Sequence, residues 1–440
     1  MRPRRIAEIF AEQSTLQAYL QIEAALAQAE ADLGVIPKDA AQKICHYARL
    51  DMLDMPRLRA QAQRSGYAVA PLVRQLTEVC GDYGHFLHWG ATTQDVVNTG
   101  LALQVNEVFR AVLGDLSRLT DILVDKVQAH RDTVMAARTF GGHALPITFS
   151  FKASVWLASV LRHVERVKSL IEHPLEGEFA GVAGTLASLG KEGLAVRKRL
   201  MELLALPEPV ITWASMRDDV YERMSVLAGI TNTLAKIAQD IAELSSTEIG
   251  ELAEPNTGGK DTSSTLPYKS NPILCAQITA AAALVAQYTA TALYAGRQRQ
   301  ERSGEGLLEI QVIAPACVEA ENCISRSMVL LVGLQVFPDR MRANLDATHG
   351  IILAERFMMA LAPRLGRLRS HDLVHDACRV AVERNVDLRT ALRDIPEVAN
   401  HLSPETLDSL ADPMGYLGSG NEISEAVVNH ARRCVPRAES

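Results

Sequence analysis

The residues best suited to chemistry form one short polar run, Ser263-Ser264-Thr265-Leu266-Pro267-Tyr268-Lys269-Ser270-Asn271. Serine hydroxyls can move protons, while a lysine and an amide can hold a carboxylate. Because Gly258 and Gly259 precede the run, it is predicted to be a flexible loop suited to closing over a small acid. On composition alone, an ordinary polar connector before a helix fits the run equally well.

Three further clusters have residues of the same kind. The segment His88-Trp89-Gly90-Ala91-Thr92-Thr93-Gln94-Asp95 precedes a long helical pattern. Its Thr and Asp residues can simply cap that helix, or the helix N-terminus can bind a carboxylate. The segment Arg138-Thr139-Phe140-Gly141-Gly142-His143-Ala144-Leu145-Pro146 is either part of a site or a loop with a solvated His143. The segment 180–185 consists almost entirely of small residues, as where backbone passes close to a ligand.

The polar run resembles the signature loop of the fumarase/aspartase superfamily, Gly-Ser-Ser-x-Met-Pro-x-Lys-x-Asn. Thr262 and Leu266 replace the glycine and the methionine, and the remaining positions match. The resemblance implies that Ser263 is the catalytic base. It also implies that Ser264, Lys269 and Asn271 bind the substrate.

The other clusters resemble further superfamily segments. Residues 88–95 are similar to its first signature, which implies that Thr92 and Thr93 hold a substrate carboxylate and that His88 lies near the leaving group. Phe140 follows Arg138-Thr139, and His143 lies three residues further on. This order resembles that in the 3-carboxy-cis,cis-muconate cycloisomerase branch of the superfamily. By this resemblance His143 is a second candidate general acid. The substrate-binding residues that it adds are Arg138, Thr139, Thr185 and Arg302.

Two departures bear on the substrate. Met216 stands where the superfamily often has a glutamine before an Arg-Asp pair. Gly306 and Gln311 occupy positions at which adenylosuccinate lyases carry a histidine and an arginine that grip the nucleotide. This pattern argues against a nucleotide substrate, while Arg302 remains available for a carboxylate. An adenylosuccinate lyase-like enzyme and a catalytically silent oligomeric scaffold are the alternatives.

Long helices must position these segments. Apolar residues at steps of three and four predict one helical face, sustained for about 45 Å, between residues 217 and 247. Similar runs cover 96–130, 148–172, 272–296 and 310–336. No alternating pattern predicts a large sheet, so we expect an all-α, three-domain, fumarase/aspartase-like fold around a central bundle. The predicted domains are an N-terminal helical domain over 1–95, the central long-helix bundle over 96–343 and a C-terminal helical domain over 344–440.

Composition limits the remaining possibilities. The net charge of −7 gives no basic footprint for nucleic acid, and seven cysteines without a C-x-x-C pair suggest reduced thiols in the cytoplasm. The uncharged segment 272–296 is long enough to cross a membrane, but its alanines and amides favour burial in a helical assembly. His371 and His375 have the spacing of zinc ligands without a third partner, so we expect no metal.

These observations together predict a lyase or cycloisomerase that needs no metal or organic cofactor. It would catalyse reversible anti elimination or addition next to a carboxylate of a small di- or tricarboxylate. One form of this reaction interconverts 3-carboxy-cis,cis-muconate and its lactone, and the other releases fumarate from a substituted succinate. The partners expected are a small carboxylate substrate and three further copies of the chain, in a homotetramer with shared active sites.

Overall fold

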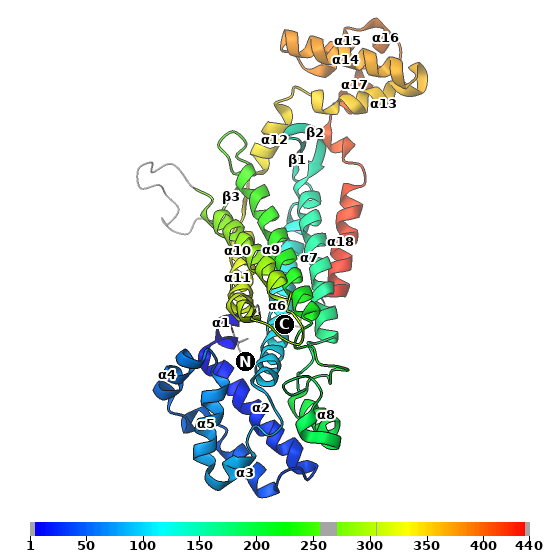
Figure 1. Ribbon diagram of the computed structural model, residues 1–440. Helices are drawn as coiled ribbons and strands as arrows, with labels where there is room; N and C mark the ends of the chain where they lie inside the picture. Colours follow the sequence, from blue (N-terminus) through cyan, green and yellow to red (C-terminus); the bar gives the residue numbers. More distant parts are fainter. Residues whose placement is uncertain (1–4, 256–270, 305, 436–440) are drawn as a thin grey trace. The chain divides into compact units, whose positions relative to one another are not determined.

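The computed structural model describes residues 5–255, 271–304 and 306–435 (Figure 1). Ser263, Ser264 and Lys269 therefore lie outside the described residues. The chain forms two compact units. Unit 1 contains Met1–Leu116, His163–Asn232 and Ala280–Ile324, and unit 2 contains Ser117–Arg162, Thr233–Thr279 and Ser325–Ser440.

The long helices that the periodicity predicts are present, which confirms the all-α class. They are α6 (Thr93–Ala129), α7 (Phe149–Glu172), α9 (Asp218–Leu244), α10 (Ile273–Ala295) and α11 (Gly306–Val332) (Figure 1). The predicted apolar stripe of α9 is buried along its whole length, from Val220 to Leu244. The predicted domain boundaries at 95 and 343 stay a prediction.

In unit 1, apolar cores lie on both sides of α2. Leu16, Leu20 and Ala27 of α2 face one apolar core, and Ile22 and Leu26 face another. The first core contains α3, α4 and α5, and the second contains α8 and the start of α6. The elements are α1 (Ile6–Ile9), α2 (Glu12–Asp32), α3 (Lys38–Tyr47), η1 (Leu50–Met52), α4 (Met55–Ser65), α5 (Val69–Cys80), η2 (Gly81–Phe86), η3 (Ala187–Glu192) and α8 (Gly193–Leu204).

In unit 2, two small antiparallel ladders accompany short helices. The strands are β1 (Val134–Thr139) with β2 (Gly142–Thr148), and β3 (Leu252–Ala253) with β4 (Gln335–Val336). Figure 1 shows β1 and β2 as a pair of arrows. Those elements are α12 (Pro338–Asp346), η4 (Ile351–Leu353), α13 (Ala354–Leu365), α14 (Arg367–Arg384), α15 (Leu388–Arg393), α16 (Pro396–Ala399), α17 (Pro404–Leu410), η5 (Pro413–Tyr416) and α18 (Gly420–Cys434).

Helix α10 has apolar residues on nearly every side. It is long and apolar enough to cross a membrane, and only 33% of its most apolar window is buried within the chain. Leu284, Leu293 and Tyr294 are exposed on it. One such helix is weak evidence for a membrane span, because the core helix of a soluble protein has the same composition. The single chain leaves much of this helix uncovered.

Candidate active site

The N-terminus of α6 is held in place by a buried carboxylate, Asp95. Thr92 precedes the helix, and its backbone N–H donates to Asp95 Oδ2 at 2.9 Å. Asp95 Oδ1 also accepts from the N–H of Ala180 at 3.0 Å, and Oδ2 accepts from the N–H of Gly181 at 3.2 Å. Burial raises the pKa of the Asp95 carboxyl, and the three N–H donors reduce this rise without cancelling it. One side chain therefore joins two predicted site segments, 88–95 and 180–185.

The hydroxyls of Thr92 and Thr93 stay available at this helix end. Both side chains are half-buried, and no hydrogen-bond partner for either hydroxyl occurs in the parts of the chain that the structure describes. Free N–H groups of the first helical turn and these hydroxyls form a suitable place for a carboxylate. Thr185 lies in the neighbouring turn with its side chain exposed to solvent.

Glycines allow the two segments to approach each other. Gly90 has φ +73°, and a Cβ added there would lie 2.7 Å from Cγ of Leu189. Gly181 also has φ +73°, and an added Cβ would lie 3.6 Å from the carbonyl oxygen of Gly90. A left-handed backbone at both positions favours glycine. The close approach observed is between two segments of the protein, and the approach of 180–185 to a ligand stays a prediction.

His88 is fixed by a buried glutamate of α2. Its Nδ1 lies 2.6 Å from Oε1 of Glu23, whose side chain is fully buried. His88 has φ +58°, a left-handed conformation that is rare for a residue with a side chain and that clusters at functional sites. With Nδ1–H donated to Glu23, Nε2 is left to act on a ligand. His88 and Thr93 both line an open cavity together with Arg74, Thr77 and Glu78, among others.

A second buried glutamate of α2, Glu30, is affected by the charge of Glu23. Neither side-chain oxygen of Glu30 has a hydrogen-bond partner within the described residues. Burial, reinforced by the charge of Glu23, raises the pKa of Glu30 to about 9. Glu30 is therefore protonated at neutral pH.

Replacing Glu23 with glutamine is expected to lower the pKa of His88. Burial alone would lower this pKa, but the charge and hydrogen bond of Glu23 outweigh burial and raise it above its usual value. The stability that the pair contributes is therefore fully present below about pH 6.5 and is lost as the pH rises through the raised folded-state pKa. NMR titration of the His88 ring in the Glu23→Gln variant should give a pKa below that in the wild type. An unchanged His88 pKa would show that the carboxylate does not control this imidazole.

The segment 138–146 is a β-hairpin, so the interpretation as a loop is wrong. Arg138 pairs with His143 in the β1–β2 ladder, and Thr139 pairs with Gly142. Phe140 and Gly141 form the turn with φ values of +51° and +81°, as a two-residue hairpin turn with positive φ at both positions requires. The sequence signal was weak, because Phe rarely adopts this backbone and no Asn-Gly pair marks the turn.

The charged group of Arg138 is already paired within unit 2. Its Nη1 and Nη2 donate to the two oxygens of Glu251 at 2.9 and 2.6 Å. Glu251 is fully buried and also accepts from Nδ2 of Asn344 at 2.8 Å. A bidentate pair of this kind fixes the orientation of the guanidinium. A contact between Arg138 and the substrate stays a prediction, as does one for the exposed Thr139.

His143 has an environment opposite to that of His88. Its ring is half-buried, and its buried Nδ1 has no hydrogen-bond partner in the described part of the chain. Burial and the charge of Arg138 lower the pKa of His143, although Glu251 opposes them. A lowered pKa keeps this imidazole neutral at pH 7, which suits a proton acceptor better than a donor.

The side chain of Glu254, which precedes residues 256–270, binds the backbone of the helix that follows them. Its side-chain oxygens accept from the N–H groups of Leu274 at 3.0 Å and Cys275 at 2.7 Å, at the start of α10. Asn271, the last residue of the predicted signature loop, is half-buried next to this start. The Glu254 carboxylate therefore caps the N-terminus of α10, which begins two residues after Asn271.

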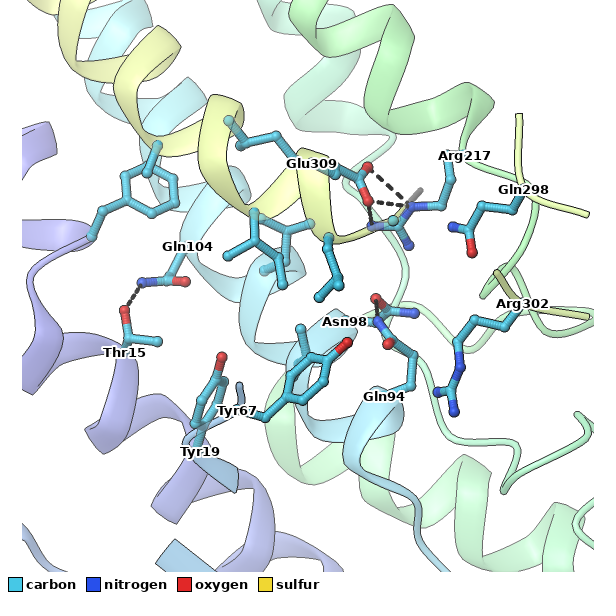
Figure 2. A pocket seen from close by; sticks show the side chains of 18 of the residues that line it. Thr15, Tyr19, Tyr67, Gln94, Asn98, Gln104, Arg217, Gln298, Arg302 and Glu309 are labelled. Atoms are coloured by element: carbon cyan, nitrogen blue, oxygen red, sulfur yellow. Dashed lines mark hydrogen bonds and ion pairs between the residues drawn. The ribbon is translucent and has the colours of Figure 1, made fainter. Parts of the chain in front are cut away.

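A cavity of about 300 Å³ lies beside the N-terminal half of α6, within unit 1 (Figure 2). Gln94, Asn98 and Gln104 of α6 line it, and among the predicted site residues that the structure describes only Arg302 lies on its wall. Arg302 is exposed and has no ion-pair partner among the described residues. Gln94 directly follows Thr93, so this cavity begins next to the proposed carboxylate position.

Comparisons with known proteins give consistent matches over nearly the whole chain. The family profile described as "Lyase" matches residues 3–286, and that described as "Adenylosuccinate lyase C-terminus" matches residues 350–427. A crystal structure of a fumarate lyase from Mesorhizobium sp. superposes with a TM-score of 0.91 at 40% identity, covering 98% of this chain and 99% of that one.

Two relatives differ in their reactions. Trans-aconitate decarboxylase 1 of Mycosarcoma maydis is 39% identical over 96% of this chain and 86% of its own length. The 3-carboxy-cis,cis-muconate cycloisomerase of Pseudomonas aeruginosa is 37% identical over 96% of this chain and 93% of its own length.

Proposed function

The chain belongs to the fumarase/aspartase superfamily of lyases, and we propose that it catalyses reversible anti elimination or addition next to a carboxylate of a small di- or tricarboxylate. The match in fold to a fumarate lyase and the match in sequence to a cycloisomerase both support this reaction class. The observation that carries the proposal is the N-terminus of α6, where Glu23 orients His88 and Asp95 orients Thr92.

The reaction needs a stabilised carbanion next to a carboxylate. A proton beside a carboxylate is weakly acidic, so its removal requires fixed positive and hydrogen-bonding groups around the resulting dianion. In this proposal Lys269, Asn271 and the hydroxyls of Thr92 and Thr93 supply them. Further substrate contacts come from Ser264, Arg138, Thr139 and Thr185, and Arg302 supplies positive charge.

Proton transfer is divided between two residues. Ser263 removes the proton from the carbon next to the carboxylate, and the carbon–leaving-group bond breaks as the double bond forms. His88 protonates the departing group, a role supported by its raised pKa and its bond to Glu23. The pKa of His143 is lowered, so this imidazole is a weaker candidate for donating the proton than His88. No cofactor takes part in either step.

A second candidate reaction is the loss of CO₂ from a tricarboxylate. It is favoured by the 39% identity to a protein named trans-aconitate decarboxylase. Decarboxylation produces negative charge at the same kind of carbon, so the same dianion-stabilising groups would serve it. The proton would then be delivered to carbon instead of being removed from it.

A substrate panel separates these reactions. The purified enzyme is incubated with 3-carboxy-cis,cis-muconate, substituted succinates and trans-aconitate, and fumarate absorbance, lactone formation and CO₂ release are followed together. Lactone or fumarate formation supports the proposal, and CO₂ release alone supports the second candidate. No turnover of any compound, without carboxylate binding, would favour the silent scaffold.

We further propose that the enzyme is a homotetramer whose active sites are shared between subunits. The apolar residues that α10 leaves exposed support this, because a monomer rarely presents a continuous apolar helix to water. A second copy would cover Leu284, Leu293 and Tyr294. The seven cysteines, with no C-x-x-C pair, suit a soluble enzyme in the reducing cytoplasm.

Light scattering is expected to give four times the chain mass at micromolar concentration. Burial of α10 in the assembly provides the driving force, since apolar area removed from water contributes about 25 cal/mol per Å². Replacing Leu293 with glutamate should shift the mass toward smaller species, whereas the same change at exposed Leu368 of α14 serves as a control. A stable wild-type monomer would contradict the proposal.

A further inference from the structure

The cavity beside α6 contains two polar side chains that are fixed in place yet incompletely paired. Arg217 is 3% exposed, and its Nε and Nη2 bind Glu309 at distances of 2.8 to 3.1 Å. Its guanidinium also stacks on Trp213, 4.5 Å from the ring centroid. Asn98 is fully buried, and its Oδ1 accepts from Nε2 of Gln94 at 2.6 Å.

Each of these side chains keeps one unpaired donor. Nη1 of Arg217 and Nδ2 of Asn98 are buried without a hydrogen-bond partner among the described residues. Figure 2 shows both side chains facing the space bounded by Gln298 and Arg302. An unpaired buried donor costs about 1–3 kcal/mol, which a ligand that supplies an acceptor recovers. The polar end of the cavity is therefore built for hydrogen-bond acceptors.

The charges at this end limit the ligand further. Glu309 neutralises Arg217, so Arg302 is the one unneutralised cation on the cavity wall described by the structure. A single positive charge suits a carboxylate or a neutral carbonyl. It repels an ammonium group, and it is too little for a doubly charged phosphate.

Aliphatic side chains of α6 and α11 also line the cavity, beside the polar side chains of Thr15, Gln104 and Ser303. Along α6, Val97 and Leu101 lie on the same face as Gln94 and Asn98, and Gln94 and Leu101 are about 10 Å apart along the axis at 1.5 Å per residue. Helix α11 lines the cavity across from α6 with four aliphatic side chains, Leu307, Ile310, Ile313 and Ala314.

We propose that this cavity binds the substituent of the substrate that lies beyond the reacting carbons. The substituent carries a hydrogen-bond acceptor, neutral or singly negative, followed by an apolar extension. The acceptor binds Asn98, Arg217 and Arg302, and the extension lies between α6 and α11. This inference rests on the proposed function, because Gln94 follows Thr93, which is assigned to the reacting carboxylate.

Succinate thioethers test the proposal. Addition of thiols to maleate gives 2-succinyl derivatives of 3-mercaptopropionate, 3-mercaptopropionamide, N-butyl-3-mercaptopropionamide and cysteamine. Dissociation constants are measured by calorimetry on the Ser263→Ala variant, and fumarate release is measured on the wild type. We expect the acid and the amide to bind at least about tenfold more tightly than the ammonium compound, and the butylamide about tenfold more tightly than the amide.

The Asn98→Asp variant gives a matched test of the unpaired donor. Aspartate keeps the acceptor for Gln94 and replaces the Nδ2 donor by a negative oxygen. We expect the acid to lose at least about tenfold in affinity. The control Asn400→Asp makes the same charge change at an exposed residue outside the cavity and should leave the affinities unchanged.

The outcomes separate this inference from the proposed function. The inference would be overturned if the four dissociation constants lie within threefold of one another. It would also be overturned if Asn98→Asp and Asn400→Asp have equal effects on affinity. If Asn98→Asp does not fold, the order of the four compounds on the otherwise unchanged chain decides. The expected order without fumarate release would contradict the proposed function alone, and fumarate release at equal rates from all four would contradict the cavity assignment alone.

Discussion

Replacing Ser263 with alanine is expected to lower kcat by at least about 10³-fold with little change in melting temperature. The proposed base acts only in the transition state, so its loss removes catalysis and not substrate binding. Steady-state kinetics on the best compound of the substrate panel measures this change, and thermal unfolding followed by circular dichroism checks the fold.

The Ser270→Ala variant is the matched control for this prediction. It removes a hydroxyl from the same sequence segment, at a position that the superfamily signature leaves open. Its kcat should stay within a few fold of the wild type. Near wild-type turnover in Ser263→Ala would show that the base is another residue. His143 would then be the first candidate, because its lowered pKa keeps it neutral and able to accept a proton.

Adenylosuccinate is expected to have a kcat/KM about 10³-fold below that of the best unphosphorylated substituted succinate. A phosphate held in a closed site without a matching charge costs several kcal/mol, on the order of 10³-fold in rate. Gly306 and Gln311 stand where a nucleotide-gripping histidine and arginine are expected, and Arg217 is occupied by Glu309. Direct comparison of kcat/KM values measures the effect.

The nucleoside without its phosphate provides the control. If the phosphate causes the discrimination, succinyladenosine should be cleaved faster than adenylosuccinate. Efficient cleavage of adenylosuccinate would overturn the assignment to the cycloisomerase-like branch, while the elimination chemistry would stand.

Periodicity predicted the long helices well, because each buries a stripe of apolar residues that repeats over many turns. The largest difference is in α11, which was predicted over 310–336 and is observed at Gly306–Val332. Gly333 ends the helix, and a Cβ at this position would lie 2.4 Å from Cβ of Pro255. Gln335 and Val336 then pair with β3, a long-range contact that a local pattern cannot indicate.

The site was predicted less completely, because its supporting carboxylates come from distant parts of the sequence. Glu23 lies 65 residues from His88, and Asp95 lies 85 residues from Ala180. One signal was present, since Glu23 and Glu30 occupy buried positions of an otherwise apolar helix face. A charged residue in such a position is rarely buried unless it has a partner. Glu251 and Glu254 had no comparable local signal.

The central claim is that a proton and a leaving group depart from opposite faces of the bond next to a carboxylate. It is tested most directly in the addition direction, with fumarate and 3-mercaptopropionate in D₂O. The account predicts a thioether with one deuterium per molecule, in the single diastereomer that anti addition produces, as measured by proton coupling constants. A mixture of both diastereomers, or the diastereomer that syn addition produces, would contradict it.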